Sequence, residues 1–315
     1  MRKLAVLSLH TSPLVQPGTG DSGGMNVYVR ELVSALAQAG VACDVYTRAW
    51  APDLPPEVVV EPGVRVVHVA AGPAAEVPKD ELPGLVPEFT AGVIDDIRRS
   101  GGVDAIHANY WLSGVAGHVA KHELGLPLVS TFHTLARVKA DADVAESAQR
   151  VKAETEVIGC SDAILANCVE EADDLRRHYE APANRIEIVA PGVDHAFFSP
   201  GDRDGARAAL GWAVPSWGGA DRMSAAGGQG ATQHPVLLFV GRIQPLKGLD
   251  VAVGALAELA DRQAELVVVG GPSGPEGPGE LDRVLALADD LGVRRRIRFV
   301  DPQPHHLLST WYRAA

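Results

Sequence analysis

A glycine-rich segment, QPGTGDSGGMN from Gln16 to Asn26, lies between an apolar stretch and an amphipathic one and could bind an anion. Backbone N–H groups at the start of a helix, together with the helix dipole, attract negative charge. Gly23 and Gly24 would allow close approach of a phosphate because they lack a Cβ atom. By position alone, phosphate binding and simple packing are equally good interpretations. The spacing differs from GxGxxG, which disfavours a dinucleotide cofactor.

A second segment, VGRIQPLKG from Val240 to Gly248, ends an apolar stretch in glycine and then presents Arg242 and Lys247. Two cations at the carboxyl end of a parallel strand are suited to binding a diphosphate. A solvated surface pair is the alternative, and the motif alone does not separate the two.

Polar and aromatic residues also follow two other apolar stretches, in HANYW from His107 and in TFHT from Thr131. Side chains that follow parallel strands lie at the edge of the sheet where open α/β proteins bind ligands. The candidates in this third group are Lys79, Tyr110, His133, Thr134 and Arg150. A histidine in such a place is more often a structural hydrogen-bonding residue than a catalyst. Hydrolase chemistry has no support, since no Ser-His-Asp order, nucleophile elbow or HExxH motif is present.

The elements that must position these residues alternate between strand and helix. We expect strands at 3–9, 42–47, 64–69, 103–107, 126–131, 163–166 and 186–189, and helices at 25–38, 89–99, 112–123, 146–158 and 170–178. This alternation predicts an α/β fold with a parallel, doubly wound sheet. Glu154 and Glu156 would point to different faces of their helix, so we interpret them as structural rather than as an acid and base pair.

A glycine- and alanine-rich segment at 211–235 has little periodicity and predicts a flexible insertion. Strands at 236–240, 266–269 and 297–300 and helices at 249–261, 280–291 and 305–313 follow it. We therefore expect two domains, 1–200 and 201–315. Three strands and three helices would leave much of a sheet uncovered, and the last helix would have no following strand to pack beside, so we expect the second domain to be incomplete.

Composition narrows the classes of function. The chain has 315 residues, of which 46% are hydrophobic and 22% charged, as in folded globular proteins. Its net charge of −12 disfavours nucleic acid and anionic membranes as partners, although a few cations can still collect a small phosphorylated ligand. Three cysteines without Cys-x-x-Cys or Cys/His spacing fit a reducing cytoplasm. No stretch is long enough for a signal peptide or a membrane span, so we expect no stable membrane anchor.

Several segments together resemble the family 4 retaining glycosyltransferases, and most closely those that act on inositol 3-phosphate in mycothiol biosynthesis. The resemblance runs from residue 1 to residue 315, interrupted mainly by the segment at 211–235. It is carried by HTSPLVQPGTGDSGGMNVYV (10–29), YWLSG (110–114), FHTLARVK (132–139), PGVD (191–194), VGRIQPLKG (240–248) and GGPSGP (270–275).

The resemblance implies two Rossmann-like domains of the GT-B type, with the acceptor held mainly by the first and a UDP-sugar mainly by the second. The implied donor-binding residues are Gln16, Pro17, Gly23, Gly24, Arg242, Lys247 and Gln303. The implied acceptor-binding residues are His10, Asp21, Ser22, Gly23, Gly24, Met25, Asn26, Lys79, Tyr110, Thr134 and Arg150. His133, Arg242 and Lys247 would take part in catalysis.

The implied reaction transfers N-acetylglucosamine from UDP-N-acetylglucosamine to 1D-myo-inositol 3-phosphate with retention, through an oxocarbenium-like transition state and without a protein nucleophile. Cations beside the departing phosphate would stabilise the transition state more than the ground state. No cofactor is required for this chemistry. The family also implies a magnesium ion near the carbonyls of Tyr312, Arg313 and Ala315.

Some residues depart from the family pattern. Asn109 stands where a histidine is usual, and Phe132 and Arg137 also differ, so the acceptor is less well specified than the donor. Family 4 relatives that make sucrose phosphate or other glycosides share features of the FHTLARVK segment, so an enzyme of the sucrose-phosphate-synthase kind is one alternative. The family continues beyond residue 315 into a glutamate pair that holds the donor, so a truncated, non-catalytic paralogue is another. The sequence leaves the oligomeric state open, with exposed sheet faces favouring association such as a homodimer.

Overall fold

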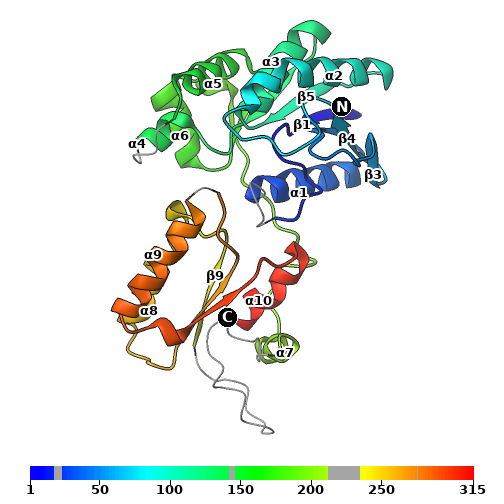
Figure 1. The fold of residues 1–315 in the computed structure, drawn as a ribbon. Coiled ribbons are helices and arrows are strands. Elements are labelled where there is room, and N and C mark those ends of the chain that lie inside the picture. The colour runs from blue at the N-terminus through cyan, green and yellow to red at the C-terminus, as the bar shows by residue number, and fades with distance from the viewer. Residues whose placement is uncertain (18–22, 142–145, 212–234, 275) are drawn as a thin grey trace. The chain divides into compact units, whose positions relative to one another are not determined.

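The computed structural model describes residues 1–17, 23–141, 146–211, 235–274 and 276–315 (Figure 1). The chain divides into two compact units, of which the first comprises Met1–Val15 and Met25–Gly192 and the second comprises Gln16–Gly24 and Val193–Ala315. The main change of unit falls between Gly192 and Val193, compared with the boundary after residue 200 that the sequence suggested. The predicted insertion at 211–235 lies, apart from its two end residues, outside the described residues.

An eight-stranded sheet in the order β3-β4-β2-β1-β5-β6-β7-β8 forms the centre of the first unit. Every neighbouring pair is parallel except β3 with β4, which is antiparallel. The doubly wound parallel sheet is thus confirmed, with one antiparallel edge strand that was not predicted. The strands are β1 (Lys3–Leu7), β2 (Ala42–Arg48), β3 (Glu57–Glu61), β4 (Val64–Val69), β5 (Ala105–Asn109), β6 (Leu128–Thr131), β7 (Ala163–Ala166) and β8 (Ile186–Ile188).

Alternate residues of β1 belong to two separate cores, which shows that helices cover both faces of this sheet. Leu4 and Val6 pack with α1 (Gly24–Gln38) through residues that include Val29. Ala5 and Leu7 pack on the other side, in a core to which α2 (Val86–Arg99), α3 (Trp111–Leu124), α5 (Ala148–Cys160) and α6 (Val169–Tyr179) contribute. A short helix, α4 (Ala136–Asp141), was not predicted.

Local chemistry fixes where these helices begin and end. Ser147 caps α5, because its side chain accepts a hydrogen bond from the backbone N–H of Arg150. Gly125 ends α3 in the left-handed conformation, with φ of 66°, that glycine adopts without steric cost. These two ends set the lengths of α3 and α5, which matter for the sites described below.

The second unit is a parallel three-stranded sheet in the order β11-β10-β9. One face packs on α8 and α9, and the other packs on Trp311 of α10 and on Leu210, which follows α7. The last helix packs on an element that was not predicted, because α7 lies against α10 and the Arg207 guanidinium donates to the Ala314 carbonyl oxygen at 2.8 Å. The elements are α7 (Arg203–Ala209), β9 (Val236–Val240), α8 (Leu249–Glu258), β10 (Glu265–Val269), α9 (Gly277–Asp290), β11 (Ile297–Val300) and α10 (Leu308–Ala314).

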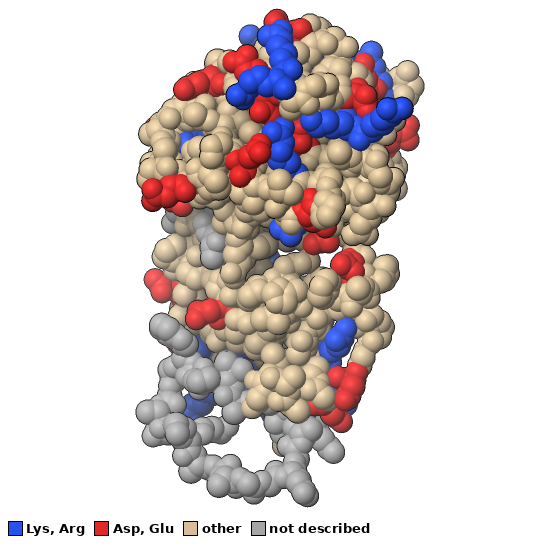
Figure 2. Space-filling view, turned by 90° about the vertical axis from the view of Figure 1, so that its right-hand side faces the viewer, with Lys and Arg blue, Asp and Glu red and all other residues tan. Residues whose placement is uncertain are grey.

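Charged side chains of both signs are interspersed on the molecular face drawn in Figure 2, as expected for a chain with net charge −12. Among the residues that the structure describes, no helix has both the length and the apolar character needed to cross a bilayer.

Candidate functional site

The strand order of the first unit reverses between β1 and β5, which lie side by side at the centre of the sheet. Open α/β sheets bind ligands at the carboxyl ends of the strands that flank such a point. His10 follows β1 and Tyr110 follows β5, and their ring centroids are 4.5 Å apart. The topology therefore brings two predicted acceptor residues together, although 100 positions separate them in the sequence.

Tyr110 is the centre of this group. It is buried and has φ of 74°, which is rare for a residue with a side chain and is found where the surrounding structure enforces it. Nζ of Lys79 lies 5.2 Å from the centroid of the Tyr110 ring, and Cζ of Arg150 lies 5.1 Å from it. Two cations and a histidine thus surround one aromatic ring.

Arg150 is held by three further groups. Its Nε donates to Glu154 at 2.7 Å, its Nη1 donates to Glu146 at 2.8 Å, and its Nη2 donates to the carbonyl and hydroxyl oxygens of Thr134 at 3.0 and 3.1 Å. The side chain of Arg150 is 3% exposed and that of Glu154 is 0% exposed. The guanidinium is therefore fixed in place before any ligand arrives.

Glu154 also binds groups from two other helices. It accepts hydrogen bonds from the backbone N–H of Ala136 at 2.9 Å and from the Tyr179 hydroxyl. The structural interpretation of this carboxylate is borne out, since it joins α4, α5 and α6. Lys139 donates to Glu146 at 2.8 Å and completes the group. Sequence reasoning assigned no role to Glu146, which lies in no motif, or to Lys139, which ends the FHTLARVK segment, because the two become partners only through the fold.

His133 follows β6 and has φ of 61°. Burial first, and then the nearby His107, lowers the pKa of His133 to about 3, so the ring is neutral near pH 7. Its Nε2 lies 3.0 Å from Oδ1 of Asn109, which can only accept, so Nε2 carries the proton and Nδ1 is the acceptor. Asn109, the departure from the family pattern, therefore sets the tautomer of His133.

Two other histidines near this edge are also held neutral. Burial, followed by the charge of Lys79, holds the pKa of His10 well below its usual value, and Nδ1 of His10 is buried without a hydrogen-bond partner among the described residues. Burial lowers the pKa of His107 to about 4, and its Nε2 lies 2.9 Å from the Thr131 hydroxyl. An unpartnered buried nitrogen on His10 is a polar atom that a ligand could satisfy.

The remaining predicted acceptor residues come from the glycine-rich segment. Asn26 is buried, and its amide donates at 2.6 Å to the Thr11 hydroxyl and to the Ser12 carbonyl. It therefore ties the loop after β1 to α1. Met25 is half-buried against both cores of the first unit, whereas Asp21 and Ser22 lie outside the described residues.

The loops that follow β9 and β10 form the strand ends of the second unit, near which the predicted donor residues lie. Gly241 follows β9, and its backbone N–H donates to the Val269 carbonyl of β10 at 3.0 Å. A Cβ atom added to Gly270, which has φ of 149°, would lie 1.9 Å from the carbonyl oxygen of Gly241. The backbones of the loops after β9 and β10 therefore touch, and this approach excludes any side chain at residue 270.

Arg242 precedes the short 3-10 helix Pro245–Lys247 that follows β9, and Lys247 is the last residue of that helix. Arg242 is half-buried and Lys247 is exposed. The described residues of Gln16–Gly24 are grouped with this unit, and a Cβ atom added to Gly23 would lie 3.4 Å from Nε of Arg242. Arg242 thus lies beside the glycine with which it was predicted to share the donor diphosphate.

The other predicted donor residues are Gln303 in the second unit and Gln16, Pro17 and Gly24 in the glycine-rich segment. Gln303 follows β11, and its side-chain amide donates to the Asp301 carbonyl at 3.0 Å. Gln16 is exposed, Pro17 is half-buried, and a Cβ atom added to Gly24 would meet nothing within 4 Å. The strand-end position of Gln303 is the same as that of Gly241 and Gly270, so all three lie at one edge of the sheet.

The magnesium ligands that the resemblance implied lie in the last turn of α10. Tyr312, Arg313 and Ala315 would offer backbone carbonyls, whereas Mg²⁺ in proteins is usually held by one or two carboxylates with several waters. Arg313 donates to the Ser199 carbonyl at 2.9 Å, and Arg207 donates to the carbonyl of Ala314. The Arg207 guanidinium therefore already binds a carbonyl that lies between two of the implied ligands, and the magnesium ion stays a prediction.

A cavity of about 630 Å³ lies elsewhere on the first unit, between α2, α3 and α5. Its wall includes Trp111, Val115 and Ala153, and among the described residues it includes none of those predicted to bind donor or acceptor. The chemistry suggested by sequence and geometry therefore belongs to the strand ends and not to this apolar cavity.

Comparison with known proteins agrees with this arrangement. Residues 22–197 match the family described as Glycosyltransferase Family 4, and residues 226–315 match the family described as Glycosyl transferases group 1. The chain belongs to glycosyltransferase family 4. It is therefore a hexosyltransferase by family, as the sequence predicted.

Relatives of this glycosyltransferase share much of its sequence. A protein from Actinosynnema mirum named D-inositol 3-phosphate glycosyltransferase is 45% identical over 100% of the chain, which covers 74% of that relative. A protein of the same name from Acidothermus cellulolyticus is 44% identical over 100% of the chain and is covered to 68%. The resemblance inferred from the motifs is thus confirmed.

Solved structures confirm the GT-B fold. A sucrose-phosphate synthase from Thermosynechococcus elongatus matches 100% of the chain with a TM-score of 0.83 and 28% identity, and 74% of that structure is covered. The Anabaena protein HepE, solved with UDP and glucose, matches 100% of the chain with a TM-score of 0.69 and 17% identity, and 72% of it is covered.

Proposed function

We propose that this glycosyltransferase transfers N-acetylglucosamine from UDP-N-acetylglucosamine to 1D-myo-inositol 3-phosphate with retention, a step of mycothiol biosynthesis. The observation that carries the proposal is the group around Tyr110, where Lys79, Arg150 and His10 meet at the point where strand order reverses. The chain that contains it is 45% identical to a protein named for the same acceptor.

The charges of this group suit a phosphorylated acceptor. Lys79, Lys139 and Arg150 supply three positive charges, and Glu146 and Glu154 supply two negative ones. These five side chains together carry one net positive charge, which suits a phosphate. A guanidinium that is already fixed by carboxylates loses little conformational entropy when it binds, which favours affinity.

Hydroxyl groups of the acceptor would find a neutral partner in the same group. Nδ1 of His10 is buried without a partner among the described residues, and the low pKa of this ring keeps it uncharged. A neutral nitrogen can accept a hydrogen bond from a hydroxyl or donate one to a phosphate oxygen, depending on its tautomer. A polyol phosphate offers both groups.

The second unit would stabilise the leaving group. The acceptor hydroxyl oxygen forms a bond to the anomeric carbon on the face from which UDP departs, the bond from that carbon to the phosphate oxygen breaks, and the departing phosphate takes up the hydroxyl proton. Negative charge grows on the departing diphosphate, so Arg242, Lys247 and the backbone N–H groups of Gly23 and Gly24 would act mainly in the transition state. His133 is neutral, so it would orient the sugar by hydrogen bonding instead of by charge.

A second candidate is a sucrose-phosphate-synthase-like enzyme with a sugar phosphate acceptor. The observation that favours it is the TM-score of 0.83 with the enzyme from Thermosynechococcus elongatus. Its identity of 28% is lower than the 45% shared with the protein named for inositol 3-phosphate, so we rank it second.

Release of UDP by the purified chain tests the proposal directly. The acceptors to compare are 1D-myo-inositol 3-phosphate, unphosphorylated myo-inositol and fructose 6-phosphate, each with UDP-N-acetylglucosamine and with UDP-glucose. We expect release only with the first acceptor and the first donor. Release with fructose 6-phosphate would favour the second candidate. Calorimetric binding of UDP without release on any acceptor would indicate a non-catalytic paralogue.

A further inference from the structure

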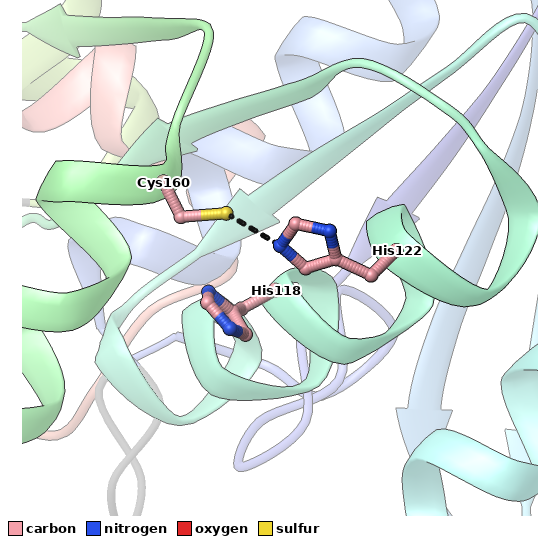
Figure 3. Close-up of side chains that lie close together, drawn as sticks. All are labelled: His118, His122 and Cys160. Carbon is pink, nitrogen blue, oxygen red and sulfur yellow. Dashed lines mark hydrogen bonds between the residues drawn. The ribbon is translucent and has the colours of Figure 1, made fainter.

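We infer that His118, His122 and Cys160 form a binding site for a Zn²⁺-type cation on the first unit. His118 and His122 lie one turn apart on α3, and Cys160 is the last residue of α5. One ligand atom from each residue lies within 4.8 Å of the other two (Figure 3). None of the three residues was predicted to bind donor or acceptor.

The types of ligand select the cation. Thiolate and imidazole groups favour Zn²⁺ and related transition metals, whereas Mg²⁺ and Ca²⁺ require oxygen ligands. Two histidines at positions i and i+4 present their rings on one face of a helix, which is a common way to supply two of the ligands.

The distances also fit. Sγ of Cys160 lies 3.3 Å from Nε2 of His122. Zinc bonds of about 2.3 Å to sulfur and about 2.0 Å to nitrogen place these two atoms about 3.5 Å apart at a tetrahedral angle. The pair is therefore already near the separation that a shared metal ion would impose, and the ligand atom of His118 lies within 4.8 Å of both.

His118 supplies a second, independent observation. Its Nδ1 is buried and has no hydrogen-bond partner among the described residues. A buried polar atom without a partner costs free energy unless something satisfies it, and a metal ion would do so. His122 is exposed, so the site has a path by which an ion can enter.

The charges around the cluster permit a divalent ion. Lys121 is the nearest described cation in the sequence, and its ammonium group is bound by Asp162 at 2.6 Å and by the Cys160 carbonyl at 2.9 Å. Glu156 lies one turn before Cys160 on α5 and so faces the same side of that helix. Three protein ligands leave a fourth tetrahedral position for water.

The position of the cluster gives the ion a structural role. α3 begins directly after Tyr110, and α5 carries Arg150. An ion that joins the far halves of these two helices would fix the packing that brings Tyr110 and Arg150 together. The ion would therefore support acceptor binding without touching the substrate.

The sequence did not predict this cluster, because its cysteine and histidines are not close enough in the chain to form a recognisable zinc-binding motif. Cys160 is 38 residues from His122, and α3 and α5 bring the two together only when they pack. The three cysteines are free, so Cys160 is available as a ligand.

Titration of the reduced, chelator-treated full chain with Co²⁺ tests the inference without an activity assay. Co²⁺ bound by a thiolate gives a sulfur-to-metal charge-transfer band, and tetrahedral Co²⁺ gives strong visible bands. We expect one equivalent to bind with both signals and to be displaced by Zn²⁺. Zn²⁺ should also raise the Tm of the chain, because it binds only the folded state.

Matched variants assign the site. Cys160→Ser should abolish the charge-transfer band, and His118→Gln or His122→Gln should weaken binding by more than about 100-fold, since even outer-shell partners contribute 10- to 100-fold. The controls are Cys168→Ser, at an exposed cysteine that caps the N-terminus of α6, and His306→Gln, at an exposed histidine of the second unit. Absence of a charge-transfer band in the parent chain, or its persistence in Cys160→Ser, would overturn the inference.

Discussion

The two units of this glycosyltransferase prepare their strand ends for ligands in different ways. In the first unit, side chains of α5 and of the loops before it fix the site, as when Arg150 is held by Glu146, Glu154 and Thr134. In the second unit, the backbone fixes the site. The loops at Gly241 and Gly270 approach so closely that residue 270 has no room for a side chain.

The ligands of the proposed function would account for this difference. A phosphorylated polyol must be told apart from similar sugars, and a rigid set of charged and polar side chains can do that. A diphosphate is recognised by charge and by N–H groups that any sequence with the right backbone can offer. The first site should therefore be sensitive to side-chain chemistry and the second to backbone conformation.

Gly270→Ala should have the largest effect. Its Cβ atom would lie 1.9 Å from the Gly241 carbonyl oxygen, and its φ of 149° is one that alanine avoids. We expect the second unit to lose stability by more than about 3 kcal/mol, through backbone strain and steric overlap. Hydrogen exchange read by mass spectrometry should show fast exchange in β9, β10 and β11.

Gly271→Ala is the matched control for this change. The nearest atom to its Cβ is Cγ of Pro302 at 3.6 Å, which is an ordinary contact. Protection of the three strands should survive in this variant. Equal loss of protection in both variants would show that the close approach of the two loops is not what fixes the second site.

Arg150→Ala should have the next largest effect. It would leave the buried carboxylate of Glu154 without its cation and would leave Glu146 with Lys139 alone, and an unpaired buried charge typically costs about 3 to 5 kcal/mol. We expect this loss in the free energy of urea unfolding of the first unit. Arg150→Lys keeps the charge but loses the forked geometry, so it should recover only part of the stability. Full recovery by lysine would mean that charge alone, and not side-chain geometry, builds this site.

Arg242→Ala should act on catalysis and leave stability nearly unchanged. If the guanidinium stabilises the departing diphosphate, kcat should fall by roughly 100- to 1000-fold, which is typical for one transition-state donor. The same fall is expected for Lys247→Ala, whose side chain is exposed. The measurement is single-turnover release of UDP, beside urea unfolding. A rise in KM with unchanged kcat would place these cations in ground-state binding instead.

Acid should destabilise the first unit through its buried histidines. Burial lowers the folded pKa of His107 to about 4 and of His133 to about 3, so below pH 6.5 the unfolded chain binds protons that the folded chain does not. Stability is thus complete above pH 6.5 and falls as pH falls toward the folded values. Each of these two histidines should lower the free energy of unfolding by about 2 kcal/mol between pH 6.5 and pH 5.

Urea unfolding at several pH values between 5 and 7.5 measures this slope. His107→Gln should reduce the slope, because a glutamine side chain does not titrate. His306→Gln, at an exposed histidine of the second unit, should leave the slope unchanged. A slope that is the same in His107→Gln and in the parent chain would contradict the assignment of buried neutral histidines to the first site.

Most of the fold was predictable from the sequence because short-range signals specify it. Apolar runs bounded by glycine and polar residues located each predicted strand, and helical periodicity located most helices. β3 was missed, since three valines between Glu57 and Glu61 at an exposed edge give little pattern. α4 and α7, with 6 and 7 residues, are too short to show periodicity.

The candidate sites were predictable only where a motif marks them. Tyr110, Arg150 and Thr134 were named through a family resemblance, and the fold places them in contact. The partners Glu146 and Asn109 could not be assigned in this way, because their roles depend on packing between segments far apart in the chain. The sequence therefore predicts which residues follow the strands, but it does not predict the hydrogen bonds and ion pairs that hold those residues in place.

Lys79→Ala offers the smallest expected effect and the sharpest test of what the first site recognises. The side chain is exposed, and its ammonium lies 5.2 Å from the Tyr110 ring centroid, so its loss should cost less than about 1 kcal/mol of stability. A phosphate bound over Tyr110 would lose one of its cations, and KM for inositol 3-phosphate should rise by about 5- to 10-fold for about 1 to 1.4 kcal/mol.

The control for this change is Lys152→Ala, an exposed lysine of α5 whose ammonium lies 3.8 Å from Glu156 and which takes no part in the predicted sites. Added salt should reduce the difference between the parent chain and Lys79→Ala, because exposed charges are screened, and should not alter the control. If the KM for the acceptor is unchanged in Lys79→Ala, the phosphate is recognised by Arg150 alone. The difference between a first site built from side chains and a second site built from backbone would then depend on one buried cation.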